Sequence, residues 1–318
     1  MVLKENKHLD TMVYVVLYGV VGFFSLIPFH MGQWFGKVLG RGIASVLGGR
    51  IKVSLDNLRH VYGNNMSKSA LKELNARVVV HFSQMLFETP HILRLTHANL
   101  KKYVVFENSN RLHSAIEKGR GTFILTGHLG NWELMSAAVS LRFGDKGAVI
   151  ARPIDFPPVE RLMSKLRSRF GNKVIPKQRA MRRVLKAVKE NVAIGFLMDQ
   201  NVDWYEGVFV PFLGRTACTN KGLALLALKT GSPVIPIFSA RQGDGRYRIS
   251  FGKEVELIRT GDKIRDLEEN TQLFSETLEK YIKKSPEQWF WFHRRWKTKS
   301  YCPLPEDFYT GSDSRRGL

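Results

Sequence analysis

His128 and Glu133 are the residues whose types and spacing best suit acid–base chemistry in this 318-residue chain. A neutral imidazole can take a proton from an alcohol near neutral pH. A neighbouring carboxylate can fix the tautomer of that imidazole and stabilise the imidazolium that forms. We therefore interpret His128 as a candidate general base and Glu133 as its partner.

The residues around the histidine predict how the pair is positioned. Phe123–Leu125 is a candidate buried strand, and Gly127 and Gly130 allow tight turns after it. Asn131 is a candidate N-cap that places Glu133 in the first turn of a helix. A His followed by Glu five residues later is common by chance, and only this strand–turn–helix setting favours function. We expect the two side chains to meet across the turn.

Other catalytic signatures are missing from the sequence. The H-E-x-x-H pattern of zinc hydrolases and the G-x-S-x-G pattern of serine hydrolases do not occur. No Gly-rich phosphate loop occurs either. We expect no metal and no cofactor.

The rest of the chain predicts an α/β fold, a layered mixed and largely parallel sheet flanked by helices. One or two helices are expected over residues 67–95. The candidate strands are 103–106, 122–126, 148–151, 192–198, 234–238 and 247–251. The candidate helices that follow are 133–143, 159–170, 181–188, 221–230 and 266–284. In such sheets, ligands usually bind at the carboxyl ends of strands.

The N-terminal region is apolar and flanked by positive charges. Met12–Phe29 carries no charged residue, with Lys4 and Lys7 before it and Lys37 and Arg41 after it. A retained anchor is our first interpretation, followed by an interfacial helix pair and then a core helix. We predict membrane-associated helices over residues 1–50, a catalytic domain over 51–305 and a flexible tail over 306–318.

The composition indicates an anionic partner. Lys and Arg exceed Asp and Glu by 49 to 28, which gives a formal net charge of +21. The chain has no module typical of nucleic-acid binding, so a membrane surface or an acidic protein is favoured. Cys218 and Cys302 suit a reducing compartment and are interpreted as structural.

The segment His128-Leu-Gly-Asn-Trp-Glu133 resembles the H-x-x-x-x-[D/E] motif of glycerolipid acyltransferases, in particular the lipid A biosynthesis lauroyl/myristoyl acyltransferase family. Five further elements match that family in order along nearly the whole chain. They are Ala151-Arg-Pro153, Arg167-Ser-Arg-Phe-Gly171, Asp199-Gln200, Phe209-Val-Pro-Phe-Leu-Gly214 (a loop before the next helix), and Pro286-Glu-Gln-Trp-Phe-Trp-Phe-His-Arg-Arg-Trp296.

The resemblance implies a fatty acyl thioester donor, typically acyl carrier protein and sometimes coenzyme A. It implies direct attack by a lipid hydroxyl without an acyl-enzyme. The acceptor would be a lipid A precursor at the cytoplasmic face of a bacterial inner membrane. A lysophospholipid, an ornithine-type lipid and a phosphatidylinositol mannoside remain alternative acceptors, and a non-catalytic membrane-surface protein is a different class of alternative.

Three more charged residues are candidates for substrate binding, together with Asn131. Arg152 follows a strand and could bind a phosphate or carboxylate, or form a surface salt bridge. Arg169 lies in a basic helix, where solvated arginines are common. Asp199 ends an apolar run, where it could support these arginines or act as a turn residue.

Two cationic segments have open interpretations. The basic face of the helix predicted near residues 179–189 could dock an acidic carrier protein or membrane phosphates, or be a solvated face. His293–Lys297 pairs cations with aromatics and could anchor at a membrane or pack internally.

Overall fold

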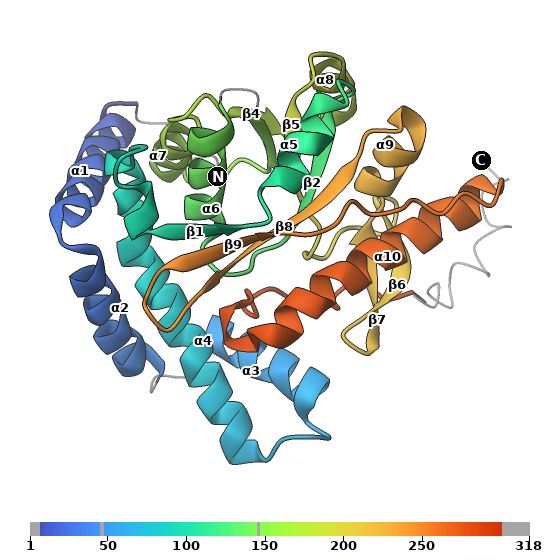
Figure 1. Ribbon diagram of the computed structural model, residues 1–318. Helices are drawn as coiled ribbons and strands as arrows, with labels where there is room; N and C mark the ends of the chain where they lie inside the picture. Colours follow the sequence, from blue (N-terminus) through green and yellow to red (C-terminus); the bar gives the residue numbers. More distant parts are fainter. Residues whose placement is uncertain (1–6, 45–47, 145–146, 301–318) are drawn as a thin grey trace, which may run out of the picture.

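A mixed sheet flanked by helices forms the body of the molecule, as expected (Figure 1). The computed structural model describes residues 7–44, 48–144 and 147–300. The α-helices are α1 (Lys7–Leu26), α2 (Phe29–Ala44), α3 (Gly49–Tyr62), α4 (Lys68–Glu88), α5 (Asn110–Glu117), α6 (Trp132–Phe143), α7 (Pro157–Arg167), α8 (Ala180–Lys189), α9 (Gly222–Thr230) and α10 (Lys263–Lys284). Short 3-10 helices span η1 (Thr89–Arg94), η2 (Leu100–Lys102) and η3 (Pro286–Gln288).

The main sheet has the strand order β1-β9-β8-β2-β5-β3-β4, and every neighbouring pair is parallel except β8 with β9. Its strands are β1 (Val104–Glu107), β2 (Thr122–Thr126), β3 (Gly147–Ala151), β4 (Lys173–Pro176), β5 (Ala193–Leu197), β8 (Val234–Arg241) and β9 (Tyr247–Phe251). A separate hairpin contains β6 (Gly207–Phe212) and β7 (Arg215–Asn220). The sequence predictions missed β4 and both hairpin strands, and the expected loop over residues 209–214 is mostly β6 and its turn.

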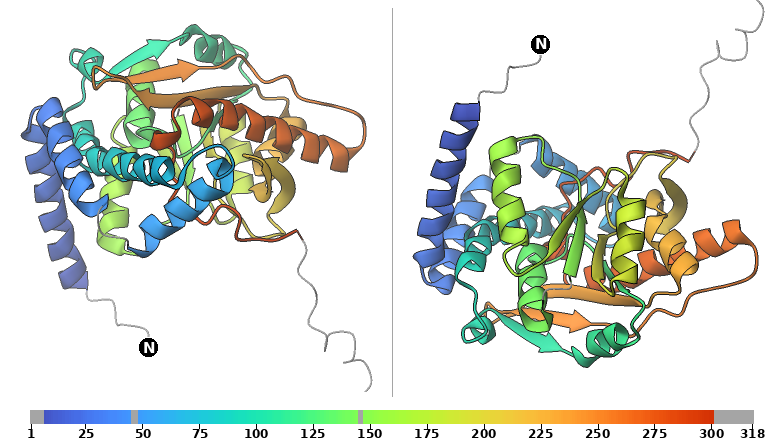
Figure 2. Two further views of the ribbon diagram at one scale, coloured as in Figure 1. Left: turned by 90° about the horizontal axis from the view of Figure 1, so that it is seen from below. Right: turned by 90° about the horizontal axis from the view of Figure 1, so that it is seen from above.

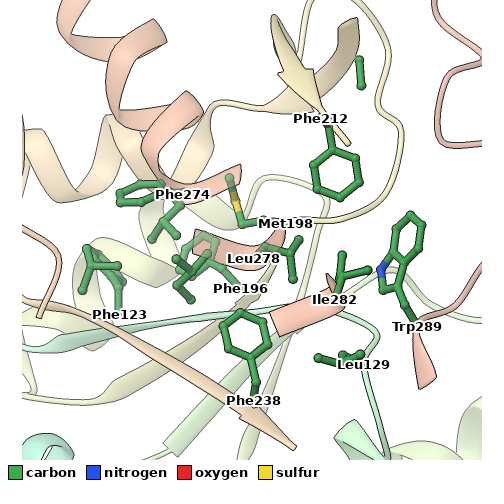
Figure 3. Close-up of a cluster of buried hydrophobic side chains, with 14 of the residues drawn as sticks. Phe123, Leu129, Phe196, Met198, Phe212, Phe238, Phe274, Leu278, Ile282 and Trp289 are labelled. Atoms are coloured by element: carbon green, nitrogen blue, oxygen red, sulfur yellow. The ribbon is translucent and has the colours of Figure 1, made fainter. Parts of the chain in front are cut away.

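Alternating side chains of the strands build a core on each face of the sheet. On β2, Phe123 and Leu125 pack among α8, α9 and α10, whereas Ile124 faces the cluster formed by α5, α6 and α7. Figure 3 shows part of the first core, where Leu129 from the loop after β2 lies near Trp289 from the C-terminal segment. The core thus extends to the loop that carries His128.

Helices α1 and α2 lie along one side of the body (Figure 2). Both expose much of their apolar surface. By length and composition, α1 is the one helix among the described residues that could cross a membrane, and 11% of its apolar window is buried. Its inner face packs on α7, where Arg161 lies over the Tyr14 ring and Lys165 over the Tyr18 ring, at 4.0 and 4.3 Å from the ring centroids. Exposed apolar side chains of the two helices include Met12, Val15, Val16, Val20, Phe23, Leu26, Met31, Trp34, Phe35, Val38, Leu39 and Ile43.

Helix α2 is held on α4 by close packing and by a buried polar network. A Cβ at Gly36 would collide with the Gln84 backbone, so only glycine permits this approach. Gln33 donates to Glu88, whose carboxylate receives two bonds of 2.9 Å from Arg241 of β8. Since Arg241 also donates to Nδ1 of buried His81 (2.8 Å), the other ring nitrogen, Nε2, carries the hydrogen and faces the Gly130 carbonyl at 3.4 Å. The network therefore reaches the loop after β2.

Part of the domain prediction falls outside what the structure covers. The expected tail, 306–318, lies outside the described residues, as does Cys302. Cys218 is buried and carries a free thiol. The boundary expected near residue 50 falls beside the start of α3 at Gly49 and stays a prediction.

Arg241→Met should lower the free energy of unfolding by about 3–5 kcal/mol, because it leaves the fully buried Glu88 carboxylate without its cation. Chemical denaturation measures this change. Arg246→Met, which removes an exposed pair with Asp244, is the matched control and should leave the midpoint nearly unchanged. Equal midpoints for the two variants would contradict a structural role for the buried pair.

Candidate active site

His128 and Asp199 meet at the carboxyl ends of two neighbouring parallel strands. Thr126 at the end of β2 is in register with Leu197 at the end of β5, and each strand is followed two residues later by one member of the pair. His128 Nδ1 lies 2.8 Å from Asp199 Oδ1, and the His128 backbone N–H donates to Oδ2 at 2.7 Å. Strand pairing therefore sets the distance between the two side chains.

The carboxylate of Asp199 is almost fully buried and fully hydrogen-bonded. Trp289 Nε1 donates to the same Oδ2 at 2.8 Å. Burial by itself raises the pKa of Asp199, but the His128 ring and the three hydrogen bonds outweigh it and hold that pKa at about 2. Asp199 is thus ionised and accepts the hydrogen on His128 Nδ1, and in the neutral form of the ring the lone pair is therefore on Nε2.

Glu133 does not bind His128, so the expected contact between these two side chains is wrong. Among the hydrogen bonds of the described residues, the Glu133 carboxylate accepts from Arg167 Nη2 at 2.6 Å, from Arg167 Nε at 3.0 Å and from Trp132 Nε1 at 3.2 Å. Burial lowers the pKa of Arg167, but the hydrogen bonds and charge of Glu133 outweigh it and raise that pKa. Helix α6 directs Glu133 toward Arg167 of α7, and this explains the changed partner.

Asn131 caps the N-terminus of helix α6. Its side-chain oxygen accepts from the Leu134 N–H at 2.9 Å, and the residue is fully buried. The N-cap prediction is confirmed, and Asn131 is not among the residues that line the cavity described below. The expected substrate contact is therefore not supported by its position.

The two predicted arginines lie outside the centre of the site. Arg152 reaches the cavity edge, but its side chain is 75% exposed and pairs with Asp155 at 3.0 Å. Arg169 is exposed in the turn after α7, over the Phe170 ring, and does not line the cavity. Arg167, two residues earlier, is the arginine that faces the site. The helix expected over residues 159–170 ends at Arg167, so Arg169 lies beyond it and only Arg167 is directed by the helix.

A cavity of about 1040 Å³ opens around His128 and extends between the helices and the sheet. Its polar lining includes Glu133, Arg167, Gln200 and His293 beside His128. The apolar lining includes Ile116, Ile124, Met135, Val139, Phe143, Ile150, Val184 and Phe196. This volume is at the upper end of the usual range for ligand pockets, about 300–1,000 Å³.

The C-terminal segment closes the back of the site. Gly130 N–H donates to the Gln288 carbonyl at 2.9 Å, and Phe290 N–H donates to the His128 carbonyl at 3.0 Å. Arg295 is fully buried, lies over the Phe212 ring and donates to the Cys218 carbonyl at 2.7 Å. Internal packing, rather than a membrane anchor, is therefore the role of Arg295 and of buried Trp296.

Sequence reasoning missed four residues of the site, namely Arg167, Gln200, Trp289 and His293. Each lies in a quoted motif, but only the fold shows which residue of the motif points inward. Within the described residues, no cluster of three or more His, Cys, Asp or Glu side chains could hold a metal ion.

Comparison with known proteins identifies the family. A family model described as bacterial lipid A biosynthesis acyltransferase matches residues 2–298. The chain belongs to this family. It is an acyltransferase by this membership, as the sequence resemblance predicted.

Three relatives show which acceptors are named for proteins similar to this chain. A lipid A biosynthesis lauroyltransferase of Escherichia coli is 22% identical over 88% of this chain and 90% of its own length. A lipid A biosynthesis acyltransferase of Haemophilus influenzae is 25% identical over 68% of this chain, and the match spans 66% of that relative, just under two thirds. A phosphatidylinositol mannoside acyltransferase of Mycolicibacterium smegmatis is 24% identical over 64% of this chain and 65% of its own length.

His293 should make stability depend on pH. Burial lowers its pKa to about 4, whereas an unfolded histidine titrates near 6.5. Between these values the unfolded chain binds more protons, so stability is full above about pH 6.5 and falls as the pH drops toward 4.

His293→Asn, which cannot be charged, should therefore flatten the decline of the unfolding free energy between about pH 6.5 and pH 4. Denaturant titrations at a series of pH values measure the slope. Exposed His97→Asn is the matched control and should keep the wild-type slope. An unchanged slope in His293→Asn would show that folding does not lower the pKa of His293.

Proposed function

We propose that this protein transfers a fatty acyl chain from a thioester donor, acyl carrier protein, to a hydroxyl of a lipid A precursor at the cytoplasmic face of the inner membrane. The pair of His128 and the buried Asp199 carboxylate beside the cavity is the observation that supports this proposal most. The family match supports the acyltransferase class and a lipid acceptor.

His128 acts as the general base in this mechanism. Asp199 holds the hydrogen on Nδ1, so the Nε2 lone pair faces the cavity and can take the proton of an acceptor hydroxyl. The apolar lining of the cavity suits a fatty acyl chain. No side chain forms a covalent intermediate in this scheme, because the hydroxyl attacks the thioester directly.

Glu133 acts through Arg167. Its carboxylate fixes the guanidinium at the cavity wall, near the start of α6. A guanidinium held in this way can bind a phosphate or carboxylate oxygen of a substrate with its remaining N–H groups. Glu133 is therefore a positioning residue in our account, and Arg152 offers a second cation at the cavity edge.

One alternative acceptor is supported by a relative of this chain. The relative that acts on a phosphatidylinositol mannoside supports a different glycolipid acceptor with the same chemistry. Acyl transfer assays with purified acceptors decide between a lipid A precursor, a lysophospholipid, an ornithine-type lipid and a mannosylated phosphoinositide.

We also propose that the outer face of α1 and α2 attaches the protein to the membrane. A helix pair with one face packed on the domain and the other apolar suits the membrane interface. The positive net charge favours an anionic lipid surface.

Asp199→Asn should lower the acyl transfer rate about 10²–10⁴-fold. Two N–H donors face Oδ2, so the asparagine must place its carbonyl oxygen there and its NH₂ group toward His128 Nδ1. The hydrogen of His128 then moves to Nε2, and the base is lost. Steady-state acyl transfer measures the effect, and the exposed Asp155→Asn is the matched control.

Near wild-type rates in both Asp199→Asn and His128→Ala would contradict the mechanism. If Asp199→Asn keeps the wild-type acyl transfer rate while His128→Ala loses it, Asp199 has no part in the mechanism.

Val16→Glu/Val20→Glu/Phe23→Glu should strongly reduce flotation with vesicles that contain anionic phospholipid, because the charges prevent burial of the α1 face. The control is Ile264→Glu, which changes an exposed apolar residue at the start of α10 and should float like the wild type. Equal flotation of the triple variant would contradict attachment through α1.

A further inference from the structure

Three consecutive residues after β5 each contact one of the two histidines that line the cavity. Asp199 accepts from His128 Nδ1, and Gln200 Nε2 lies 3.4 Å from His128 Nε2. The backbone N–H of Asn201 donates to His293 Nε2 at 2.6 Å. One short segment therefore sets the state of both rings.

The contact with Asn201 fixes the tautomer of His293. A nitrogen that accepts a hydrogen bond carries a lone pair, so the single hydrogen of the neutral ring is on Nδ1. Burial keeps the ring neutral, since it lowers the pKa of His293 to about 4. Among the hydrogen bonds of the described residues, none engages this Nδ1. His293 thus offers an uncommitted N–H group in a cavity that His128 shares.

The loop that carries His293 is held firmly in place. The side-chain amide of Asn57 donates to the carbonyls of Trp291 and His293, at 2.8 and 2.7 Å. The neighbouring Arg295 is anchored under the β6–β7 hairpin. A donor on such a loop is pre-organised, as stabilisation of a developing charge requires.

Gln200 is the second donor beside the reacting atoms. The Nε2 lone pair of His128 can only accept, so the Gln200 amide donates to it. An acceptor hydroxyl that binds His128 Nε2 takes this place. The Gln200 N–H is then released next to the carbon that the hydroxyl attacks.

We propose that His293 and Gln200 are the oxyanion donors of this site, an inference that rests on the proposed acyl transfer. The hydroxyl oxygen attacks the thioester carbonyl carbon while His128 Nε2 takes its proton. The carbonyl electron pair moves onto oxygen, and this oxyanion accepts from His293 Nδ1–H and the Gln200 amide. When the oxyanion collapses, the C–S bond breaks and the thiolate takes the proton from His128, giving an ester and a thiol.

The test compares His293→Phe, His293→Asn, Gln200→Met and wild type in two assays with an acyl-carrier-protein thioester. One assay follows acyl transfer to a lipid hydroxyl, and the other follows hydrolysis, in which water is the nucleophile. His293→Phe should lower kcat about 10²–10³-fold in both assays with a nearly unchanged KM for the thioester. His293→Asn should recover part of the loss, because its amide can donate, and Gln200→Met should lower kcat in the same direction.

His91→Phe is the matched control, since it replaces a buried histidine that does not line the cavity. It should stay much closer to the wild-type kcat than His293→Phe. A wild-type kcat in His293→Phe, or an equal loss in His91→Phe, would overturn the proposal. A wild-type protein that hydrolyses the thioester but acylates no lipid would refute the proposed function, while the hydrolysis rates would still decide the role of His293.

Discussion

The hydrogen bond between His128 and the buried Asp199 carboxylate is the interaction on which the site depends. Placing a carboxylate in the core is costly unless its lone pairs are satisfied. Here the His128 ring, the His128 backbone and the Trp289 indole satisfy it, and they come from two separate parts of the chain. The pairing of β2 with β5 and the placement of the C-terminal segment therefore both act on one carboxylate.

Elements that are distant from β2 and β5 in the sequence also contribute to the position of this carboxylate and of His128. The segment after α10 pairs with the loop after β2, and it also brings Trp289 to Asp199 and His293 to the cavity. The Arg241 network connects the α2–α4 pair to the same loop through His81. The helices that we propose to lie at the membrane are thus joined to the site by packed, hydrogen-bonded elements.

Much of the fold was predictable because the chain alternates apolar strand runs with helical stretches. The predicted strand at 247–251 matches β9, and the predicted 122–126 matches β2. Strand order was not predictable, since no local pattern indicates that β2 and β5 are neighbours. The choice of Glu133 as the partner of His128 was wrong for that reason: Asp199 is 71 residues away but in register across the sheet. Local rules did predict Asn131 as an N-cap, which depends only on its own helix.

The tautomer of His128 tests the central claim most directly, and ¹⁵N NMR of the ring nitrogens in the full-length protein measures it. We predict a hydrogen on Nδ1 in the wild type and in Glu133→Gln, and a hydrogen on Nε2 in Asp199→Asn. A tautomer that changes in Glu133→Gln and stays the same in Asp199→Asn would contradict the account, because Glu133 would then be the residue that orients the base.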